Sequence, residues 1–133
     1  MKTRVRLFLL VLLSTLLFAC TAKPMLSNLR TALDQDGKDP VSSFSPSDTI
    51  FAVADLNKAP TGTTVVVKWI AVEVEGLDPD MMFQEQTMEV PEDNYTSSIF
   101  FQVSVAEAWP TGKYKVEMYL NGTLSQTVDY TIE

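Results

Sequence analysis

Several residue types that build common active sites are scarce in this chain. It contains no histidine and one cysteine, and its five glycines are spread singly. The Ser-His-Asp and Cys-His catalytic arrangements and every histidine-containing zinc site are therefore excluded, as is a glycine-rich phosphate loop. A carboxylate pair of the glycosidase kind is compatible with the composition. The acidic residues, however, fall in predicted turns or on outward strand faces, so we expect no enzymatic activity and no cofactor.

One acidic stretch has some features of a calcium-binding loop. In the segment DQDGKD, Asp34, Asp36 and Asp39 lie around Gly37. The EF-hand pattern requires an oxygen ligand where Lys38 stands and a glutamate where Ser45 stands. Because both are missing, we expect an acidic turn between strands and no metal site.

Basic residues are also few, with ten Lys and Arg against 17 Asp and Glu. Three of the ten are Lys2, Arg4 and Arg6, and the first 19 residues contain no acid. Residues 20–133 therefore carry seven basic and 17 acidic side chains, a formal charge of −10. This charge argues against binding nucleic acid, where Lys and Arg contacts to phosphate dominate affinity. It also argues against lying flat on an anionic membrane.

The N-terminus has the organisation of a secretory signal. After the basic residues comes LFLLVLLSTLLF, an apolar run over 7–18 that is shorter than the roughly 20 residues of a membrane-spanning helix. The next residues complete LLFAC, which resembles a bacterial lipobox ending at Cys20. The resemblance implies that Cys20 is acylated with palmitate-type chains and becomes the first residue of the mature protein. The alternative is an ordinary secretory peptide with a chance cysteine at the cleavage site.

The lipobox resemblance also predicts the organisation and location of the protein. We expect a signal peptide over 1–19, an acylated cysteine and tether over 20–25, and one domain over 26–133. Thr21 follows the cysteine, and by resemblance to lipoprotein sorting a residue other than Asp there favours the outer membrane of a two-membrane bacterium.

The rest of the chain is patterned as short strands separated by turns. Residues 25–34 fit a helix or a strand almost equally, and we favour a strand. The other predicted strands cover 48–56, 63–76, 81–90, 97–105, 112–120 and 123–133. The segments between them are rich in Pro, Gly, Asn and Asp. The pattern predicts an all-β fold, a single antiparallel β-sandwich of about seven strands.

Alternation predicts which side chains face the core. In the last two strands the inward residues are Tyr114, Val116, Met118, Leu120, Leu124, Val128, Tyr130 and Ile132. Asn121-Gly122 indicates a two-residue hairpin turn, yet such a turn sets Leu120 opposite Thr123. We therefore expect a bulge beside the turn, with Gly122 at positive φ, to bring Leu120 opposite Leu124.

Two other strands show informative alternation. In 63–76 the apolar residues change face near Ile70 and Ala71, which requires either a bulge or cover on both faces. In 97–105 the inward residues are Ile99, Phe101, Val103 and Val105, which leaves Phe100 outside.

Two features are similar to those of immunoglobulin-like and fibronectin-III-like sandwiches. Trp69 lies in a central strand, and GKYKV over 112–116 follows a Pro-Thr turn near the chain's end. In those sandwiches the tryptophan is buried, and the tyrosine equivalent to Tyr114 bonds back to the backbone across a corner. The resemblance covers roughly 26–133 and carries no catalytic residues.

The candidate interaction surface consists of Trp109, Tyr119, Phe100 and Ile70. Whether these residues gather into a patch or are scattered is open at this stage. We predict a membrane-anchored envelope lipoprotein that acts as a non-enzymatic binding or structural module toward an envelope protein or glycan. The alternative is an anchored inhibitor of a secreted hydrolase, of protease or lysozyme type, that uses a protruding loop at 77–82 or 90–95.

Overall fold

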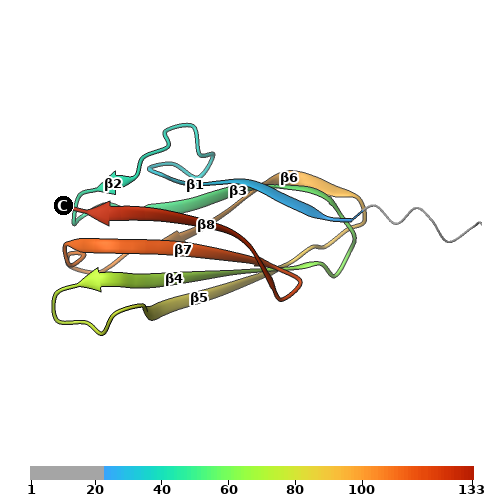
Figure 1. Cartoon of the computed structure of the whole chain (residues 1–133). Helices are drawn as coiled ribbons and strands as arrows, with labels where there is room; N and C mark the ends of the chain where they lie inside the picture. Colours follow the sequence, from blue (N-terminus) through green and yellow to red (C-terminus); the bar gives the residue numbers. More distant parts are fainter. Residues whose placement is uncertain (1–22) are drawn as a thin grey trace, which may run out of the picture.

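The computed structural model describes residues 23–133, which form a two-layered β-sandwich (Figure 1). The predicted signal peptide and Cys20 lie outside the described residues. The strands are β1 (Met25–Ala32), β2 (Ser43–Phe44), β3 (Ile50–Ala59), β4 (Thr64–Val74), β5 (Met81–Glu89), β6 (Tyr95–Val103), β7 (Gly112–Leu120) and β8 (Thr123–Ile132). Across 23–133 there is no helix, and so none there is long and apolar enough to cross a membrane. The all-β prediction is confirmed, as is a strand at the start of the domain.

The strands form one sheet of three and one of five. The first has the order β1-β3-β6, and the second has the order β2-β8-β7-β4-β5. All pairs are antiparallel except β2 with β8, which is parallel. The expectation of a purely antiparallel sandwich of about seven strands was therefore wrong in this detail. Strand β2 has only two residues, too few to show alternation in the sequence.

The first strand and β2 belong to different sheets, so the chain crosses between layers over 33–42. This segment is pinned to the edge of β1, where the Val41 amide donates to the Thr31 carbonyl at 3.0 Å and the Leu33 amide donates to Asp39 at 3.2 Å. The carbonyl of Ser42, just before β2, then accepts the Thr131 amide, and the carbonyl of Phe44 in β2 accepts the Glu133 amide. The crossing therefore covers one edge of both sheets.

Inward-facing apolar side chains from both sheets make the core. Trp69 is fully buried on β4, as expected, and its indole donates to the Gln86 side chain at 3.0 Å. The Gln86 amide in turn donates to the Gln102 carbonyl on β6, which links the two sheets. Most of the predicted inward residues are buried, including Ile99, Phe101, Val103, Tyr114, Val116, Met118, Tyr130 and Ile132.

Two predicted core residues are exposed. Val105 is 39% exposed because β6 ends at Val103, so the alternation does not continue to it. Leu124 is 50% exposed for a reason that lies in the hairpin. Register pairs Leu120 with Thr123 and Tyr119 with Leu124, and the one-residue offset comes only between Leu124 and Gln126. Opposed residues share a face, so Leu124 lies on the outer face beside Tyr119.

The expected bulge is thus present, but it lies beyond Leu124 and not beside the turn. The turn itself is a strict two-residue turn in which Asn121 (φ 49°) and Gly122 (φ 82°) both have positive φ, as the tightest hairpin type requires. Gly122 therefore serves the turn, and Ser125 is the extra residue of the bulge.

The change of face in β4 is explained by bulges. Val72 has no partner on β7, between the pairs Ala71–Tyr114 and Glu73–Lys113. On the other side, β5 contributes an extra residue, Phe83, between its pairs with Trp69 and Ile70. The bulge at Val72 returns Val74 to the buried face.

Tyr114 forms the predicted corner. Its hydroxyl donates to the Pro110 carbonyl at 2.7 Å, and its ring stacks on Tyr130 with centroids 5.3 Å apart. Both tyrosines are 2% exposed, and burial raises the pKa of each phenol. The two hydroxyls differ in one respect, since that of Tyr130 is buried without a hydrogen-bond partner within 23–133.

This pair gives a controlled prediction. Tyr114→Phe leaves the Pro110 carbonyl without its donor, so we expect a loss of about 1–3 kcal/mol in the free energy of unfolding. Tyr130→Phe removes an unsatisfied polar atom from the core, so we expect it to be neutral or stabilising. Denaturant midpoints of the two variants measure the contrast. Equal destabilisation by both would contradict the corner bond.

Candidate interaction surface

The four residues of the predicted surface differ in how exposed they are in the structure. Trp109 and Ile70 are each only 7% exposed. The Trp109 amide donates to the Pro46 carbonyl at 2.8 Å and its indole donates to the Asp48 carbonyl at 2.9 Å. Its ring packs against Phe83. Trp109 is thus part of the core, and the expectation that it is exposed was wrong.

The remaining two residues lie on different layers. Phe100 is 46% exposed on the outer face of the three-stranded sheet, with its ring 6.2 Å from that of Phe51. Tyr119 is half-buried on the outer face of the five-stranded sheet. Because these faces point away from each other, the four residues do not form one patch.

The outer face of the five-stranded sheet carries a polar network that the sequence analysis did not identify. Lys68 places its ammonium 4.6 Å from the centre of the Tyr119 ring, a cation–π distance. The Tyr119 hydroxyl donates to the Glu117 carboxylate at 2.6 Å, and Lys115 pairs with the same carboxylate at 3.1 Å. Alternation in the sequence places residues 115, 117 and 119 on the outer face. It does not show that Lys68 lies opposite Glu117, because that depends on how β4 and β7 pair.

The groups of this network shift one another's pKa values. The Tyr119 hydroxyl, and then Lys115, lower the pKa of the Glu117 carboxyl. Conversely, the adjacent Glu117 carboxylate raises the pKa of the Tyr119 phenol. Both shifts favour the ionised carboxylate of Glu117 and the neutral phenol of Tyr119.

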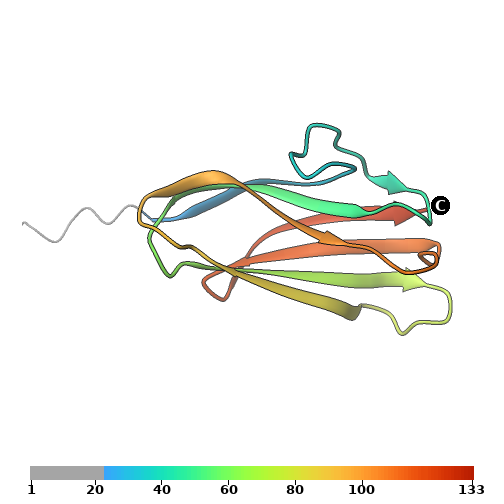
Figure 2. The same cartoon turned by 180° about the vertical axis from the view of Figure 1, so that it is seen from behind.

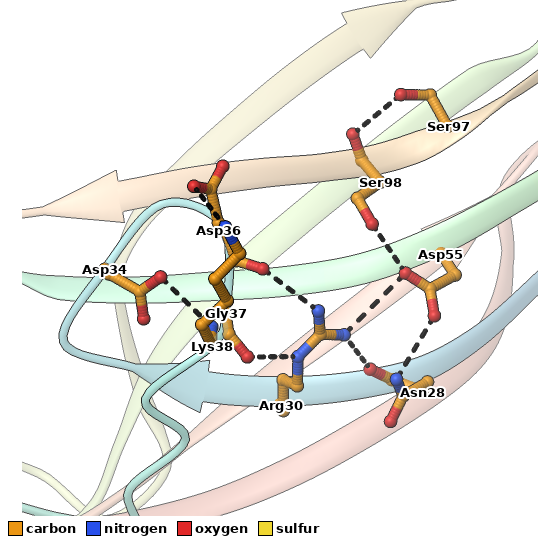
Figure 3. Close-up of polar contacts among 9 residues, drawn as sticks. All are labelled: Asn28, Arg30, Asp34, Asp36, Gly37, Lys38, Asp55, Ser97 and Ser98. Atoms are coloured by element: carbon orange, nitrogen blue, oxygen red, sulfur yellow. Dashed lines mark hydrogen bonds and ion pairs between the residues drawn. The ribbon is translucent and has the colours of Figure 1, made fainter.

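The outer face of the three-stranded sheet holds a second network, centred on Arg30 (Figure 3). Its guanidinium donates to the carbonyls of Gly37 at 3.0 Å, Asn28 at 3.0 Å and Asp36 at 3.3 Å. It also lies 3.8 Å from the Asp55 carboxylate. Arg30 therefore clamps the acidic loop onto the sheet.

Asp55 completes this network from β3. It accepts from the Ser98 hydroxyl at 2.8 Å and from the Asn28 side chain at 3.1 Å. These two hydrogen bonds, followed by the charge of Arg30, lower the pKa of the Asp55 carboxyl. Asn28 can point toward Asp55 because it occupies a bulge in β1 at φ 54°.

The acidic loop DQDGKD is a backbone-supported turn. The Asp34 carboxylate accepts the amides of Asp39 at 2.8 Å and Lys38 at 3.0 Å. These bonds lower the pKa of the Asp34 carboxyl. Among the described residues, no group of three His, Cys, Asp or Glu side chains could hold a metal ion.

A shallow depression of about 400 Å³ lies where β4, β7 and β8 meet the segment that leads into β2. Its lining residues are Ser42, Val72, Lys113, Tyr114, Asp129, Tyr130 and Thr131. Lys113 is 67% exposed and pairs with Glu73 at 3.1 Å. The depression therefore brings a few polar groups together at an open surface, without a buried charge aimed into it.

The two loops considered for an inhibitor are short connections at opposite ends of the sandwich. One joins β4 to β5 over 75–80, and the Asp80 amide closes it by donating to the Val72 carbonyl. The other joins β5 to β6 over 90–94, and the Asp93 carboxylate in it accepts the Thr61 amide at 2.9 Å. Neither forms the long projecting loop that this alternative requires.

Comparison with known proteins gives information on the fold alone. No family model and no curated protein matches the sequence. Solved structures do match, including the Pseudomonas fluorescens alkylpurine DNA glycosylase AlkC bound to abasic-site DNA, at 12% identity and TM-score 0.55 over 84% of this chain and 31% of that one. A Listeria innocua beta-glucosidase matches at 7% identity and TM-score 0.53, over 83% of this chain and 16% of that one. The β-glucosidase EmGH1 of Erythrobacter marinus matches at 10% identity and TM-score 0.56, over 88% and 18% of the respective chains. This chain thus spans less than a third of each of these enzymes, and the likeness is one of β-sandwich architecture.

Proposed function

We propose that this chain is a lipid-anchored lipoprotein of the bacterial cell envelope whose β-sandwich is a non-enzymatic binding or structural module. The observation that carries this proposal is the position of Cys20. It is the single cysteine, it completes LLFAC after an apolar leader, and it precedes the first strand at Met25 by five residues. A cysteine placed there can hold the sandwich at a membrane through acyl chains.

We further propose that the sandwich belongs to the immunoglobulin-like or fibronectin-III-like group. Three features support this assignment. Trp69 is buried on β4, the Tyr114 hydroxyl bonds back to Pro110 four residues earlier, and the strands divide as β1-β3-β6 and β2-β8-β7-β4-β5. The corner tyrosine and buried tryptophan are marks of that group.

The non-enzymatic role is supported by the chemistry of the surface. The chain has no histidine. Arg30 pairs with Asp55 and donates to the Gly37 carbonyl, and Lys115 pairs with Glu117. The enzymatic activities of the similar solved structures are properties of those much longer chains. A fold of this kind serves many functions, so the activity must come from a site.

The proposed location is the envelope, and the outer membrane in a two-membrane bacterium because Thr21 follows the cysteine. The proposed partner is an envelope protein or glycan. Nucleic acid is not proposed, because the chain past residue 19 carries 17 acidic and seven basic side chains, the wrong sign for binding phosphates.

Mass spectrometry of the mature protein from its bacterial host tests the anchor directly. We expect the N-terminal residue to be Cys20, with a mass increment for acyl chains on its peptide. An N-terminus at another residue, or an unmodified Cys20, would contradict the proposal. Palmitate labelling of the same sample is an independent measurement of the modification.

A further inference from the structure

The two ends of the sandwich differ in their distance from the anchor. Figures 1 and 2 show, from opposite sides, that β1 begins at one end of the sandwich and the C-terminus lies at the other. The entry end, here called the base, carries the connections 60–63, 90–94 and 121–122. The opposite end, here called the tip, carries the connections 45–49, 75–80 and 104–111 and the C-terminus.

Chain length fixes how far the base can lie from the acylated cysteine. Cys20 and Met25 are separated by five peptide units, which span at most about 17 Å when fully extended. The strands between base and tip contain up to 11 residues, and at about 3.3 Å per residue they separate the ends by roughly 30–35 Å. The base is therefore held close to the membrane, whereas the tip is free to stand well beyond it.

The base and the tip also differ in the number of acidic side chains that they carry. The segments 45–49, 75–80 and 104–111 and the final residue contain no basic side chain and six acidic ones, Asp48, Glu75, Asp78, Asp80, Glu107 and Glu133. The connections of the base contain two acidic side chains, Glu92 and Asp93, and no basic one. Lys23 and Lys58 lie in the segments that flank the base, and Lys113 lies beside the tip, where it pairs with Glu73. Within a Debye length of about 8–10 Å, an anionic bilayer therefore repels the tip more strongly than the base.

We propose that the base faces the lipid surface and that the acidic tip points away from it, where Leu77 (38% exposed) and Val105 (39% exposed) are accessible to partners. This orientation rests on the lipid anchor at Cys20 proposed above. Tether length and charge polarity are separate observations, and both favour the same orientation.

Site-specific fluorescence on the full acylated chain tests the orientation. The thiol of Cys20 is consumed by acylation, so an introduced cysteine is the one free thiol. Pro91→Cys labels the base and Val105→Cys labels the tip, both at exposed residues. In vesicles of phosphatidylcholine and phosphatidylglycerol that contain a headgroup spin-labelled lipid, we expect quenching of the label at 91 to be several-fold stronger than at 105.

The failure of the orientation and the failure of the anchor give different results. If the protein floats with the vesicles but both labels are quenched equally, or the label at 105 more, the orientation is overturned. If the protein does not float, the anchor is overturned and the orientation with it.

A longer tether tests whether the short tether is what holds the base near the lipid. Inserting about 20 Gly and Ser residues between Ala22 and Lys23 adds a flexible span of about 25 Å. We expect quenching at 91 to fall toward the value at 105. Unchanged quenching at 91 would show that the base adheres to lipid by itself and would overturn the tether as the cause.

Discussion

Replacing Cys20 by serine should move the protein from the detergent-rich phase of a phase-partition experiment to the aqueous phase. Each buried methylene of an acyl chain contributes about 0.8 kcal/mol, so the loss of two or more chains removes nearly all of the membrane affinity. The net charge beyond residue 19 is strongly negative, so an anionic bilayer does not attract the domain by itself. This is the largest effect that we expect from any single substitution.

A matched variant separates the loss of the anchor from a general defect in export. Thr21→Ser changes the neighbouring residue and retains the cysteine, so we expect it to partition like the unaltered protein. Both variants should give the same circular dichroism spectrum, because the strands begin only at Met25. Retention of the Cys20→Ser protein in the detergent phase, with its apolar leader removed as shown by its mass, would refute the lipid anchor.

Gly112→Ala should destabilise the domain by about 3 kcal/mol or more, from backbone strain and overpacking together. Gly112 opens β7 at φ 152°, a conformation that residues with a side chain rarely adopt. A Cβ there would lie 2.6 Å from the Glu73 carbonyl oxygen and 3.1 Å from the Val74 Cα. Both neighbours are backbone atoms of the adjacent strand, so neither can move without disturbing the β4–β7 pairing.

Gly62→Ala is the control for this prediction. Gly62 also has positive φ, at 81°, but no atom lies within 4 Å of the position that a Cβ would take. We therefore expect Gly62→Ala to show the cost of strain alone, and Gly112→Ala to exceed it. The free energies of unfolding, measured with urea, provide the comparison. Equal values for the two variants would contradict the close approach of β4 to Gly112.

The parts of the fold that were predicted correctly depend on local signals. Alternation along a strand has a period of two and is visible within a few residues, so seven of the eight strands and the buried Trp69 could be identified. The corner at Tyr114 follows from a short pattern whose hydrogen bond closes within four residues. The change of face in β4 was also visible, although its cause, a bulge at Val72, requires the partner strand.

The errors have a common physical origin in pairing between distant segments. Strand β2 exists because Ser43 and Phe44 lie beside the end of β8, and no local property marks them. The hairpin bulge could satisfy the same hydrophobic pattern at more than one position, and the chain places it at Ser125. Trp109 is buried by contacts with Pro46 and Asp48, which lie about 60 residues earlier.

The two surface networks could not be predicted from the sequence for the same reason. Outward positions could be assigned by alternation, but a network needs register as well. Lys68 reaches Glu117 and Tyr119 only because β4 and β7 pair with that offset. The bulge in β1 lies beside Arg30, which pairs with Asp55, and the loop that returns after β1 places Gly37 beside Arg30. The spacing of these residues along the chain predicts neither contact.

The parallel pair of β2 with the end of β8 has a mechanical consequence. A domain held by its N-terminal end and pulled by a partner at the other end is loaded along its strands. Their inter-strand hydrogen bonds run across the strands, so such a load must shear many bonds together and cannot open them one after another. The bonds from Thr131 to Ser42 and from Glu133 to Phe44 fasten the terminal strand against that shear. A force applied between the two ends of the sandwich is thus opposed by bonds that lie across its direction.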